Sequence, residues 1–327
     1  MSPNNSSLAK KPKFKKYKKP SGENKIPFTW KEFKKQWFLM LCTLIIVVYG
    51  IIFYYVPIAG WIMAFQHYKP KTGLLHSKFV FLDKFIFLFT DDTFIKVIRN
   101  TLCMGVINLV VTFITAIAFA ILLNEIKSTF GKKSVQTISY LPHFLSWIIV
   151  TGILHDALSP TGIINDLLMR SGAIDQAINF FAHPKYFWAI VAFANNWKET
   201  GWNAIIYLSA ITAIDPTLYE AASIDGAGRW AKIKHITLPG IRPTIMILLL
   251  MNVGNVLNAG FEVQYLLGNG LIKSVSETID IYVLTWGISQ NDFSLGTPAG
   301  MFKSAVSIAL IVLANWAAKK TGDDSLF

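Results

Sequence analysis

Long apolar runs alternate with short polar stretches along this chain. Each run approaches the length of about 20 residues that a helix needs to cross a bilayer. We expect six membrane-spanning helices, at residues 37–56, 97–123, 135–154, 186–211, 244–267 and 301–318. Lysine clusters, prolines and glycines fall between the runs, where loops are expected. The pattern therefore predicts an all-α integral membrane protein.

The composition agrees with a chain that lies in lipid. Of the 327 residues, 53% are hydrophobic and 15% are charged, and the mean hydropathy is +0.44. This is more apolar side chain than one soluble core needs. The two cysteines, Cys42 and Cys103, both lie in apolar runs and form neither a disulfide framework nor a metal-binding spacing. We interpret them as packing residues.

The net charge of +12 is concentrated at the N-terminus. The lysines of this tail, residues 1–36, include Lys10, Lys11, Lys13, Lys15, Lys16, Lys18, Lys19 and Lys25. Such a run is typical of a disordered cytoplasmic arm near anionic lipid, which argues against nucleic acid as a partner. A cleavable signal peptide is the competing interpretation. The long basic region and the full-length apolar run that follows it favour an uncleaved anchor.

Six crossings place both termini on the same side of the membrane. The basic tail and the lysine-rich segments near 127–133, 229–234 and 319–320 then all lie in the cytoplasm, as the positive-inside rule requires. The segments 58–96, 155–185 and 268–300 fall outside. We expect the basic tail, a first helix with its external loop (37–96), a core of five helices (97–318) and a cytoplasmic C-terminus (319–327). Four external lysines, Lys69, Lys71, Lys78 and Lys84, run mildly against the rule.

The cytoplasmic segment 212–243 has clear helix signals. Asp215 and Pro216 form a helix start, because a carboxylate can cap free N–H groups and proline suits the first helical position. Gly226 and Gly228 provide the stop. A second short helical stretch follows near Arg229 to Lys234. The sequence therefore predicts a short helix–turn–helix held just outside the membrane.

This segment also carries the spacing E-A-A, three residues, G, nine residues and I-x-L-P. It resembles the cytoplasmic loop by which permease subunits of binding-protein-dependent ABC importers engage their ATPase. The resemblance implies a type I importer permease fold, also called MetI-like. It also implies ATPase-coupling roles for Glu220, Ala221, Ala222, Asp225, Gly226, Ile236, Leu238 and Pro239.

Further stretches are similar to sugar-type permeases, and coverage runs from about residue 40 to the C-terminus. They include Arg99-Asn100-Thr101-Leu102, Tyr140-Leu141-Pro142 and Ser159-Pro160-Thr161-Gly162-Ile163-Ile164-Asn165. Others, such as Ala64-Phe65-Gln66-His67-Tyr68 and Leu141-Pro142-His143-Phe144-Leu145-Ser146-Trp147, are similar to a branch that takes up oligosaccharides derived from polysaccharides.

The resemblance implies a multi-pass protein of the bacterial plasma membrane that imports a carbohydrate by alternating access. The implied partners are a second homologous permease, two cytoplasmic ATPase subunits that hold ATP and Mg, and an extracellular or periplasmic sugar-binding protein. No cofactor is expected on this chain.

The sequence does not support catalysis by this chain. Residues 131–134, Gly-Lys-Lys-Ser, come nearest to a phosphate-binding loop but lack its spacing and its preceding strand. The six histidines form no metal-binding pair, and no serine lies in a nucleophile elbow. We therefore expect that the chain is not an enzyme.

Polar residues interrupt the fourth and fifth apolar runs. The candidates for a substrate path are Asn195, Asn196, Trp197, Glu199, Trp202, Asn203, Asn252, Asn255 and Asn258. On a helix, residues 196, 199 and 203 would share one face. Amides suit sugar hydroxyls and tryptophan faces suit sugar C–H surfaces. The alternative is that these residues bond neighbouring helices, as intramembrane asparagines commonly do. Both interpretations stay open at this point.

Two other functions are consistent with parts of the sequence. An ion-coupled secondary transporter would account for Glu199 within the membrane but leaves the loop around Glu220 without a purpose. A membrane-embedded glycan-processing enzyme would need catalytic carboxylates in a cleft, for which Glu262 and Asp280 give little support.

Overall fold

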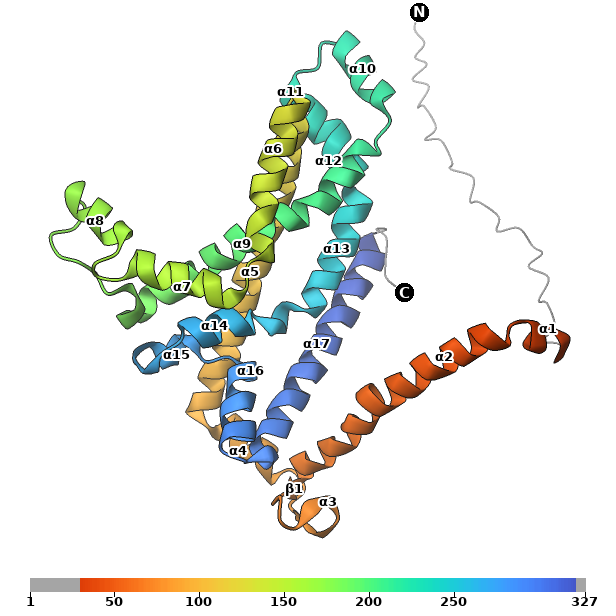
Figure 1. Cartoon of the computed structure of the whole chain (residues 1–327), viewed down its shortest axis with the longest axis vertical. Helices are drawn as coiled ribbons and strands as arrows, with labels where there is room; N and C mark the ends of the chain where they lie inside the picture. The colour runs from red at the N-terminus through yellow and green to blue at the C-terminus, as the bar shows by residue number, and fades with distance from the viewer. Residues whose placement is uncertain (1–29, 322–327) are drawn as a thin grey trace, which may run out of the picture. The chain divides into compact units, whose positions relative to one another are not determined.

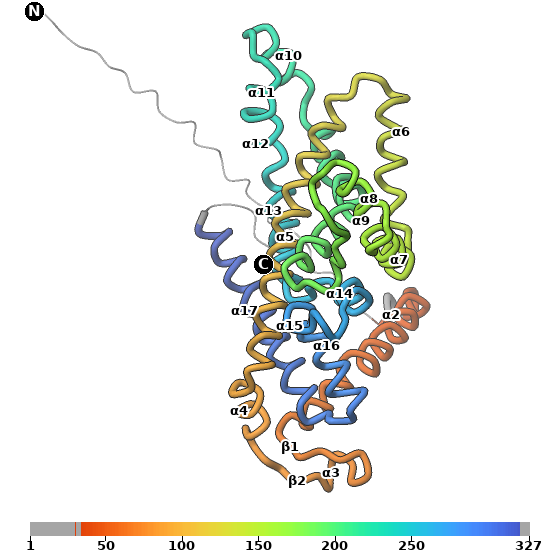
Figure 2. Tube along the Cα trace, turned by 90° about the vertical axis from the view of Figure 1, so that its left-hand side faces the viewer, coloured from red at the N-terminus to blue at the C-terminus, as the bar shows by residue number. Residues whose placement is uncertain are grey.

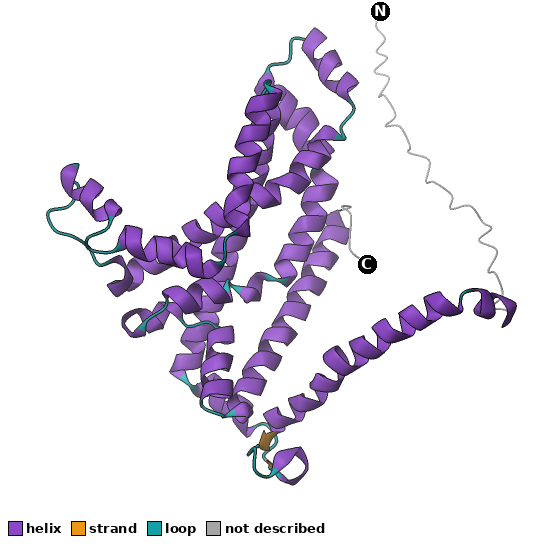
Figure 3. Cartoon of the chain, viewed as in Figure 1, coloured by secondary structure: helices purple, strands orange, loops and turns teal. Residues whose placement is uncertain are grey.

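The computed structural model describes residues 30–321, which are almost entirely helical (Figure 3). Contacts divide the chain into two compact units between Ala59 and Gly60. Most of the basic tail predicted to be disordered lies outside the described residues. Its described end forms a short helix, α1 (Trp30–Lys35). The last residues of the expected cytoplasmic C-terminus, 322–327, also lie outside the described part.

In its described part, the first unit contains α1 and one apolar helical rod. It runs from α2 (Trp37–Gly50) through a π-helical turn, η1 (Ile51–Tyr55), into a 3-10 segment, η2 (Val56–Phe65), which crosses the unit boundary. The predicted end at Pro57 was wrong, because proline near the start of a helical segment removes no needed hydrogen bond. None of the side chains of α2 is buried, as expected for a helix surrounded by lipid.

The second unit begins with a small ribbon that the all-α prediction missed. Strand β1 (Gln66–His67) pairs antiparallel with β2 (Lys78–Phe79), and α3 (Gly73–His76) lies between them. The backbone N–H of Tyr68 donates to Ser294 Oγ at 2.8 Å, which ties the ribbon to the C-terminal part of the chain. A short helix, α4 (Asp83–Thr90), follows.

Two long helices, α5 (Asp92–Glu125) and α9 (Pro184–Thr212), form the scaffold of this unit (Figures 1 and 2). Asp91 caps α5 by accepting from the N–H of Thr93, and Pro184 occupies the first turn of α9. Buried alanines, Ala116 and Ala120 on α5 and Ala204 on α9, lie in one core cluster with Leu208. Small residues let the two backbones approach closely, as is usual between membrane helices.

The third predicted span, 135–154, is not one helix. Helix α6 (Thr129–Tyr140) gives way to a 3-10 turn, η3 (Leu141–Phe144), and α7 (Trp147–Leu158) starts a new axis after Ser146 caps it. The prediction failed because Pro142 and extended backbone at Leu145 and Ser146 break the chain inside an apolar run. Helix α8 (Ile163–Arg170) and a short turn, η4 (Phe180–Ala182), complete this region.

The predicted helix–turn–helix is confirmed as α10 (Pro216–Ile224) and α11 (Arg229–Lys232). Figure 1 places it at the end of the unit opposite to β1. A π-helical turn, η5 (Ile233–Thr237), and a short α12 (Leu238–Gly240) lead back into α13 (Arg242–Gly254). The segments on either side of Ile241, 229–240 and 242–254, meet at an angle of 60°.

The fifth predicted span, 244–267, is also wrong as a single helix. Helix α13 ends at Gly254, a 3-10 turn, η6 (Val256–Asn258), follows, and α14 (Phe261–Leu267) starts only after a reversal. Ala259 and Gly260 both have positive φ, at 36° and 75°. The apolar pattern continues through this break, so hydropathy alone did not reveal it.

The C-terminal segment returns along α13. It comprises η7 (Gly270–Ile272), α15 (Lys273–Ser276), α16 (Ile279–Tyr282), a π-helical η8 (Val283–Ser289) and α17 (Phe293–Thr321). Lys303 on α17 pairs with Asp280 on α16 at 2.6 Å. Figure 1 shows α17 running beside α13.

Four helical segments of the described residues are long and apolar enough to cross a membrane, and a fifth is counted if the bent pair 229–254 is one span. Six spans were predicted. Helix α9 has 29 residues but carries Lys198, Glu199 and several amides, which interrupt its apolar surface. A sixth crossing therefore stays a prediction, and α9 is its natural candidate.

Gly201 allows α6 to lie against α9, and this gives a test of the packing. A Cβ at Gly201 would stand 2.1 Å from the carbonyl oxygen of Ser139. We expect Gly201→Ala to push the helices apart and to lower stability by about 1–3 kcal/mol, seen as a fall of several degrees in the thermal unfolding midpoint of the purified protein. Gly152→Ala in α7 is the matched control, because no atom lies within 4 Å of its added Cβ. Equal midpoints for the two variants would contradict the close packing.

Candidate functional site

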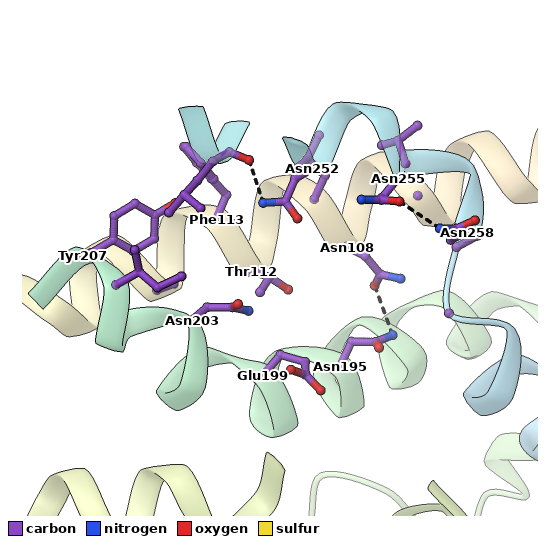
Figure 4. Close-up of a pocket in the computed structure, with 18 residues that line it drawn as sticks. Asn108, Thr112, Phe113, Asn195, Glu199, Asn203, Tyr207, Asn252, Asn255 and Asn258 are labelled. Carbon is purple, nitrogen blue, oxygen red and sulfur yellow. Dashed lines mark hydrogen bonds between the residues drawn. The ribbon is translucent and has the colours of Figure 1, made fainter. Parts of the chain in front are cut away.

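A cavity of about 260 Å³ lies between α5, α9 and the α13–η6 segment (Figure 4). It separates two apolar clusters. On one side Met104, Val191 and Val263 pack together, and on the other Ala120, Leu208 and their neighbours do. The polar side chains of the cavity lining lie between these two clusters. Along α5 and α9, a polar site therefore lies between two apolar clusters.

Helix α9 contributes Asn195, Glu199 and Asn203 to the cavity wall. These positions are four residues apart and therefore lie on one helical face. The sequence analysis instead grouped residue 196 with 199 and 203, and the structure corrects that grouping. Asn195 Nδ2 donates to Val191 O at 3.1 Å and approaches Asn108 Oδ1 at 3.4 Å.

The opposite wall holds Asn252, Asn255 and Asn258. Their spacing of three residues suits the end of α13 and the 3-10 turn η6, in which residues three apart align. Asn252 Nδ2 donates to Leu248 O at 2.8 Å, and Asn258 Nδ2 donates to Asn255 Oδ1 at 3.1 Å (Figure 4). All three predicted amides of the fifth apolar run therefore reach the cavity, because the helix breaks there.

Asn196 does not line the cavity. Its Oδ1 accepts from Thr115 Oγ1 at 2.5 Å and from Thr200 Oγ1 at 2.9 Å. Thr115 belongs to α5 and Thr200 to α9, so this amide bonds the two scaffold helices to each other. At this position the structure has the interhelical link that the sequence analysis kept as an alternative.

The predicted tryptophans also lie outside the cavity lining. Trp202 stacks flat on the ring of His143, with centroids 4.4 Å apart and planes 2° apart. Trp197 and Trp202 remain about two-fifths exposed, at 41% and 42%. Neither belongs to the lining that holds the amides.

The carboxylate of Glu199 contacts the turn between α6 and α7, which carries His143. His143 Nδ1 lies 2.9 Å from Glu199 Oε2, and Lys198 Nζ lies 3.7 Å from Glu199 Oε1. Lys198 is only 6% exposed, bonds the carbonyl oxygen of His143 and stands 5.5 Å from the Trp147 ring centroid. The sequence analysis considered the Lys198 contact but missed His143.

Among the lining residues that escaped the sequence analysis, four have polar or aromatic side chains: Asn108, Thr112, Phe113 and Tyr207. Asn108 and Thr112 are four residues apart within the apolar second run, and this spacing is the signal that could have revealed them. Phe113 and Tyr207 pack edge to face with ring centroids 6.1 Å apart. In the sequence, an aromatic residue that lines a cavity has the same pattern as one that packs in the core, so no signal marked these two residues.

The coupling loop presents the predicted residues at the surface. Glu220, Ala221, Asp225, Gly226, Leu238 and Pro239 are exposed, and Ala222 and Ile236 are half-buried. Asp215 caps α10 by accepting from the N–H of Thr217 at 2.9 Å. This backbone hydrogen bond lowers the pKa of Asp215 below its usual value. A hydrogen bond of 3.0 Å between Tyr219 OH and Thr237 Oγ1 links the two ends of the loop.

Comparison with known proteins decides the family. Residues 112–321 match a family described as "Binding-protein-dependent transport system inner membrane component". The chain belongs to this family. This importer permease is 44% identical over 294 residues to the "Polygalacturonan/rhamnogalacturonan transport system permease protein YteP" of Bacillus subtilis (strain 168), a match that covers 90% of this chain and 91% of that one.

Two further relatives support the assignment. Protein LplB of Bacillus subtilis (strain 168) is 40% identical over 282 residues, which cover 86% of the importer permease and 88% of LplB. A solved chain from a bacterial alginate ABC transporter, in complex with an alginate-pentasaccharide-bound periplasmic protein, matches with a TM-score of 0.84 and 36% identity. That match covers 91% of this chain and 99% of the other.

The family confirms the fold and the general role that the sequence resemblance implied. The chain has the type I, MetI-like importer permease fold and is a multi-pass component of the inner membrane. It is the membrane subunit of an ABC importer and is not an enzyme, because the ATPase is a separate subunit.

The contacts of Asn196 and Asn252 predict different effects for the same substitution. Asn196→Leu removes the bonds to Thr115 and Thr200, so we expect the thermal midpoint of the purified complex to fall modestly, in line with about 0.6 kcal/mol per interhelical bond. The dependence of uptake on sugar concentration should not change. Asn252→Leu removes a cavity amide whose hydrogen bond to Leu248 stays within its own helix, so uptake should weaken at an unchanged midpoint. The reverse pattern would exchange the two roles.

Proposed function

We propose that this chain imports an oligosaccharide derived from a polysaccharide, and that the sugar passes along the cavity between α5, α9 and α13. The observation that carries the proposal is the amide lining. Six asparagines, one threonine and one tyrosine side chain converge there. Amides and hydroxyls offer the donors and acceptors that sugar hydroxyls require. The names of YteP and of the alginate transporter support a saccharide as the cargo.

The connection between the coupling loop and the cavity supports the mechanism. Helix α9 lines the cavity at 195–207 and ends where the loop begins, at Thr212. Helix α13 starts where the loop ends, at Arg242, and reaches the cavity with Leu248 and Asn252. Movement of α10 therefore acts on two cavity walls at once. A rigid displacement of these helices would open the cavity to one side of the membrane at a time.

This arrangement supports the partners that the sequence resemblance implies. Two cytoplasmic ATPase subunits bind ATP and Mg and dock on the coupling loops, while a second homologous permease closes the open side of the cavity. A sugar-binding protein delivers the cargo from outside. Uptake by reconstituted vesicles that contain all these subunits tests the function. Uptake that continues without the ATPase subunits would instead indicate the ion-coupled alternative.

Gly226 and Gly228 permit a matched test of coupling. Gly226 has φ of +77°, whereas Gly228 has φ of −71°, and a Cβ at either position would meet open space. An aspartate at position 226 would have to adopt positive φ, which costs roughly 1–2 kcal/mol of backbone strain in the loop. Glu220→Ala removes an exposed carboxylate. Both should leave the complex assembled but should lower uptake per ATP hydrolysed at least tenfold.

Gly228→Asp is the control for the coupling test, since its conformation is open to any residue. It adds the same charge as Gly226→Asp and should transport normally. Normal coupling in both Gly226→Asp and Glu220→Ala would remove the proposed role of this loop.

The proposed orientation places the loop and both termini in the cytoplasm. In a background that lacks Cys42 and Cys103, a cysteine at Lys127 should react with a membrane-impermeant thiol reagent only after permeabilisation. A cysteine at Arg170, whose side chain is 77% exposed, should react in intact cells. Labelling in the opposite order would invert the topology and exchange the faces for the ATPase and the binding protein.

A further inference from the structure

The four lysines of the first predicted external loop have no acidic partner in the structure. Lys69 and Lys71 lie between β1 and α3, Lys78 belongs to β2, and Lys84 lies in the first turn of α4. Within residues 30–321, no carboxylate forms an ion pair with any of them. Lysines on the outer side oppose the positive-inside rule, so this charge needs a physical reason.

Acidic residues do not balance this charge within the segment. Between positions 66 and 90 the sequence has four lysines and one acidic residue, Asp83, which gives a net charge of +3. Lys69, Lys71 and Lys78 are exposed. The ribbon therefore presents a local concentration of positive charge that would attract an anion.

Hydrogen bonds fix the shape of the turn that carries these lysines. The backbone N–H of Lys69 donates to Ser77 Oγ at 3.3 Å, and the N–H groups of Thr72 and Gly73 donate to Lys69 O at 3.0 and 3.1 Å. Lys78 follows Ser77 directly in β2. Lys69 and Lys78 are therefore held beside the same serine before any ligand binds.

Exposed apolar side chains lie next to the cations. Leu75, in α3 at the turn of the ribbon, is 92% exposed. Phe79 follows Lys78 in β2, and Phe79 and Phe81 are also exposed, with ring centroids 6.1 Å apart. Water hydrates such side chains unfavourably, so a partner for the lysines must also cover apolar surface.

Helix α4 continues this apolar surface. Leu88 is buried in a core cluster with Phe94, whereas Ile86 and Phe87 are exposed. Thr90 ends α4, and the membrane-spanning helix α5 starts at Asp92. Figures 1 and 2 both show α4 and the ribbon at the same end of α5. Apolar side chains beside lysines at the end of a spanning helix are typical of the boundary between acyl chains and headgroups.

We propose that the β1–β2 ribbon and α4 bind lipids with anionic headgroups in the outer leaflet. Lys69, Lys71 and Lys78 contact the headgroup phosphates, while Ile86 and Phe87 contact acyl chains. A lipid carries negative charge and apolar surface in one molecule, and this combination matches the exposed residues. The inference rests on the proposed orientation, which the cysteine-labelling experiment tests separately. It does not depend on the path of the sugar.

The test places a fluorophore at the turn of the ribbon. In the background that lacks Cys42 and Cys103, Leu75→Cys is labelled with an environment-sensitive dye. The complete importer complex is then placed in nanodiscs of phosphatidylcholine with increasing fractions of phosphatidylglycerol. We expect the dye emission to shift to the blue as the anionic lipid binds. Lys69→Gln combined with Lys78→Gln should raise the fraction that gives half of the shift at least fivefold, because both cations are lost.

Two double variants are the controls. Lys69→Arg with Lys78→Arg keeps both charges and should respond like the parent complex. Arg170→Gln with Lys185→Gln removes two exposed cations from another predicted external segment and should also leave the response unchanged.

Four results would overturn the inference. They are a full shift in phosphatidylcholine alone, a full shift on adding inorganic phosphate to those nanodiscs, and equal lipid dependence of the Gln and Arg double variants. The fourth is a shift caused by the sugar-binding protein of the importer without any response to phosphatidylglycerol, which would assign the surface to a protein partner.

Discussion

The structure depends on one constraint: at membrane depth, each polar group must find its partner inside the protein or face water. The α5–α9 pair meets this demand in two ways. Where the helices touch, Thr115, Asn196 and Thr200 bond one another. Beside the cavity, Asn108 and Asn195 lie 3.4 Å apart across the same pair of helices and also line the cavity. The irregular backbone at Ala259 and Gly260 is tolerated for the same reason, since both residues line that cavity and not lipid.

Much of the fold could be predicted from the sequence, because a long apolar run is a strong signal for a membrane helix. The predicted spans 97–123 and 301–318 lie within α5 and α17, and the Asp215–Pro216 signal gives the start of α10. The spans 135–154 and 244–267 failed where an apolar run contains a break. Hydropathy measures the environment of a side chain and does not detect a turn such as Leu145–Ser146 when the turn is apolar too.

The cavity was predictable in kind but not in detail. A polar residue in an apolar run must have a partner, which drew attention to the asparagines of the fourth and fifth runs. Whether that partner is a neighbouring helix or a water-filled space depends on how the helix is rotated about its axis, and a difference of one residue position is enough to change it. Asn195 and Asn196 are adjacent, yet the first faces the cavity and the second faces Thr115. Periodicity on one helix does not fix this rotation, because the neighbouring helix determines it.

The polar face of α9 has a consequence for how the protein is made. A lysine near the centre of an isolated helix opposes insertion by roughly 3 kcal/mol, and the amides of α9 add to this. Lys198 finds its partners on η3 and α7, and Asn196 finds its partner on α5. The ribosome has already delivered all of these segments before α9 appears. The order of the chain thus lets earlier helices receive α9 as it leaves the insertion machinery, so that its polar side chains pass from water to protein and need not meet lipid.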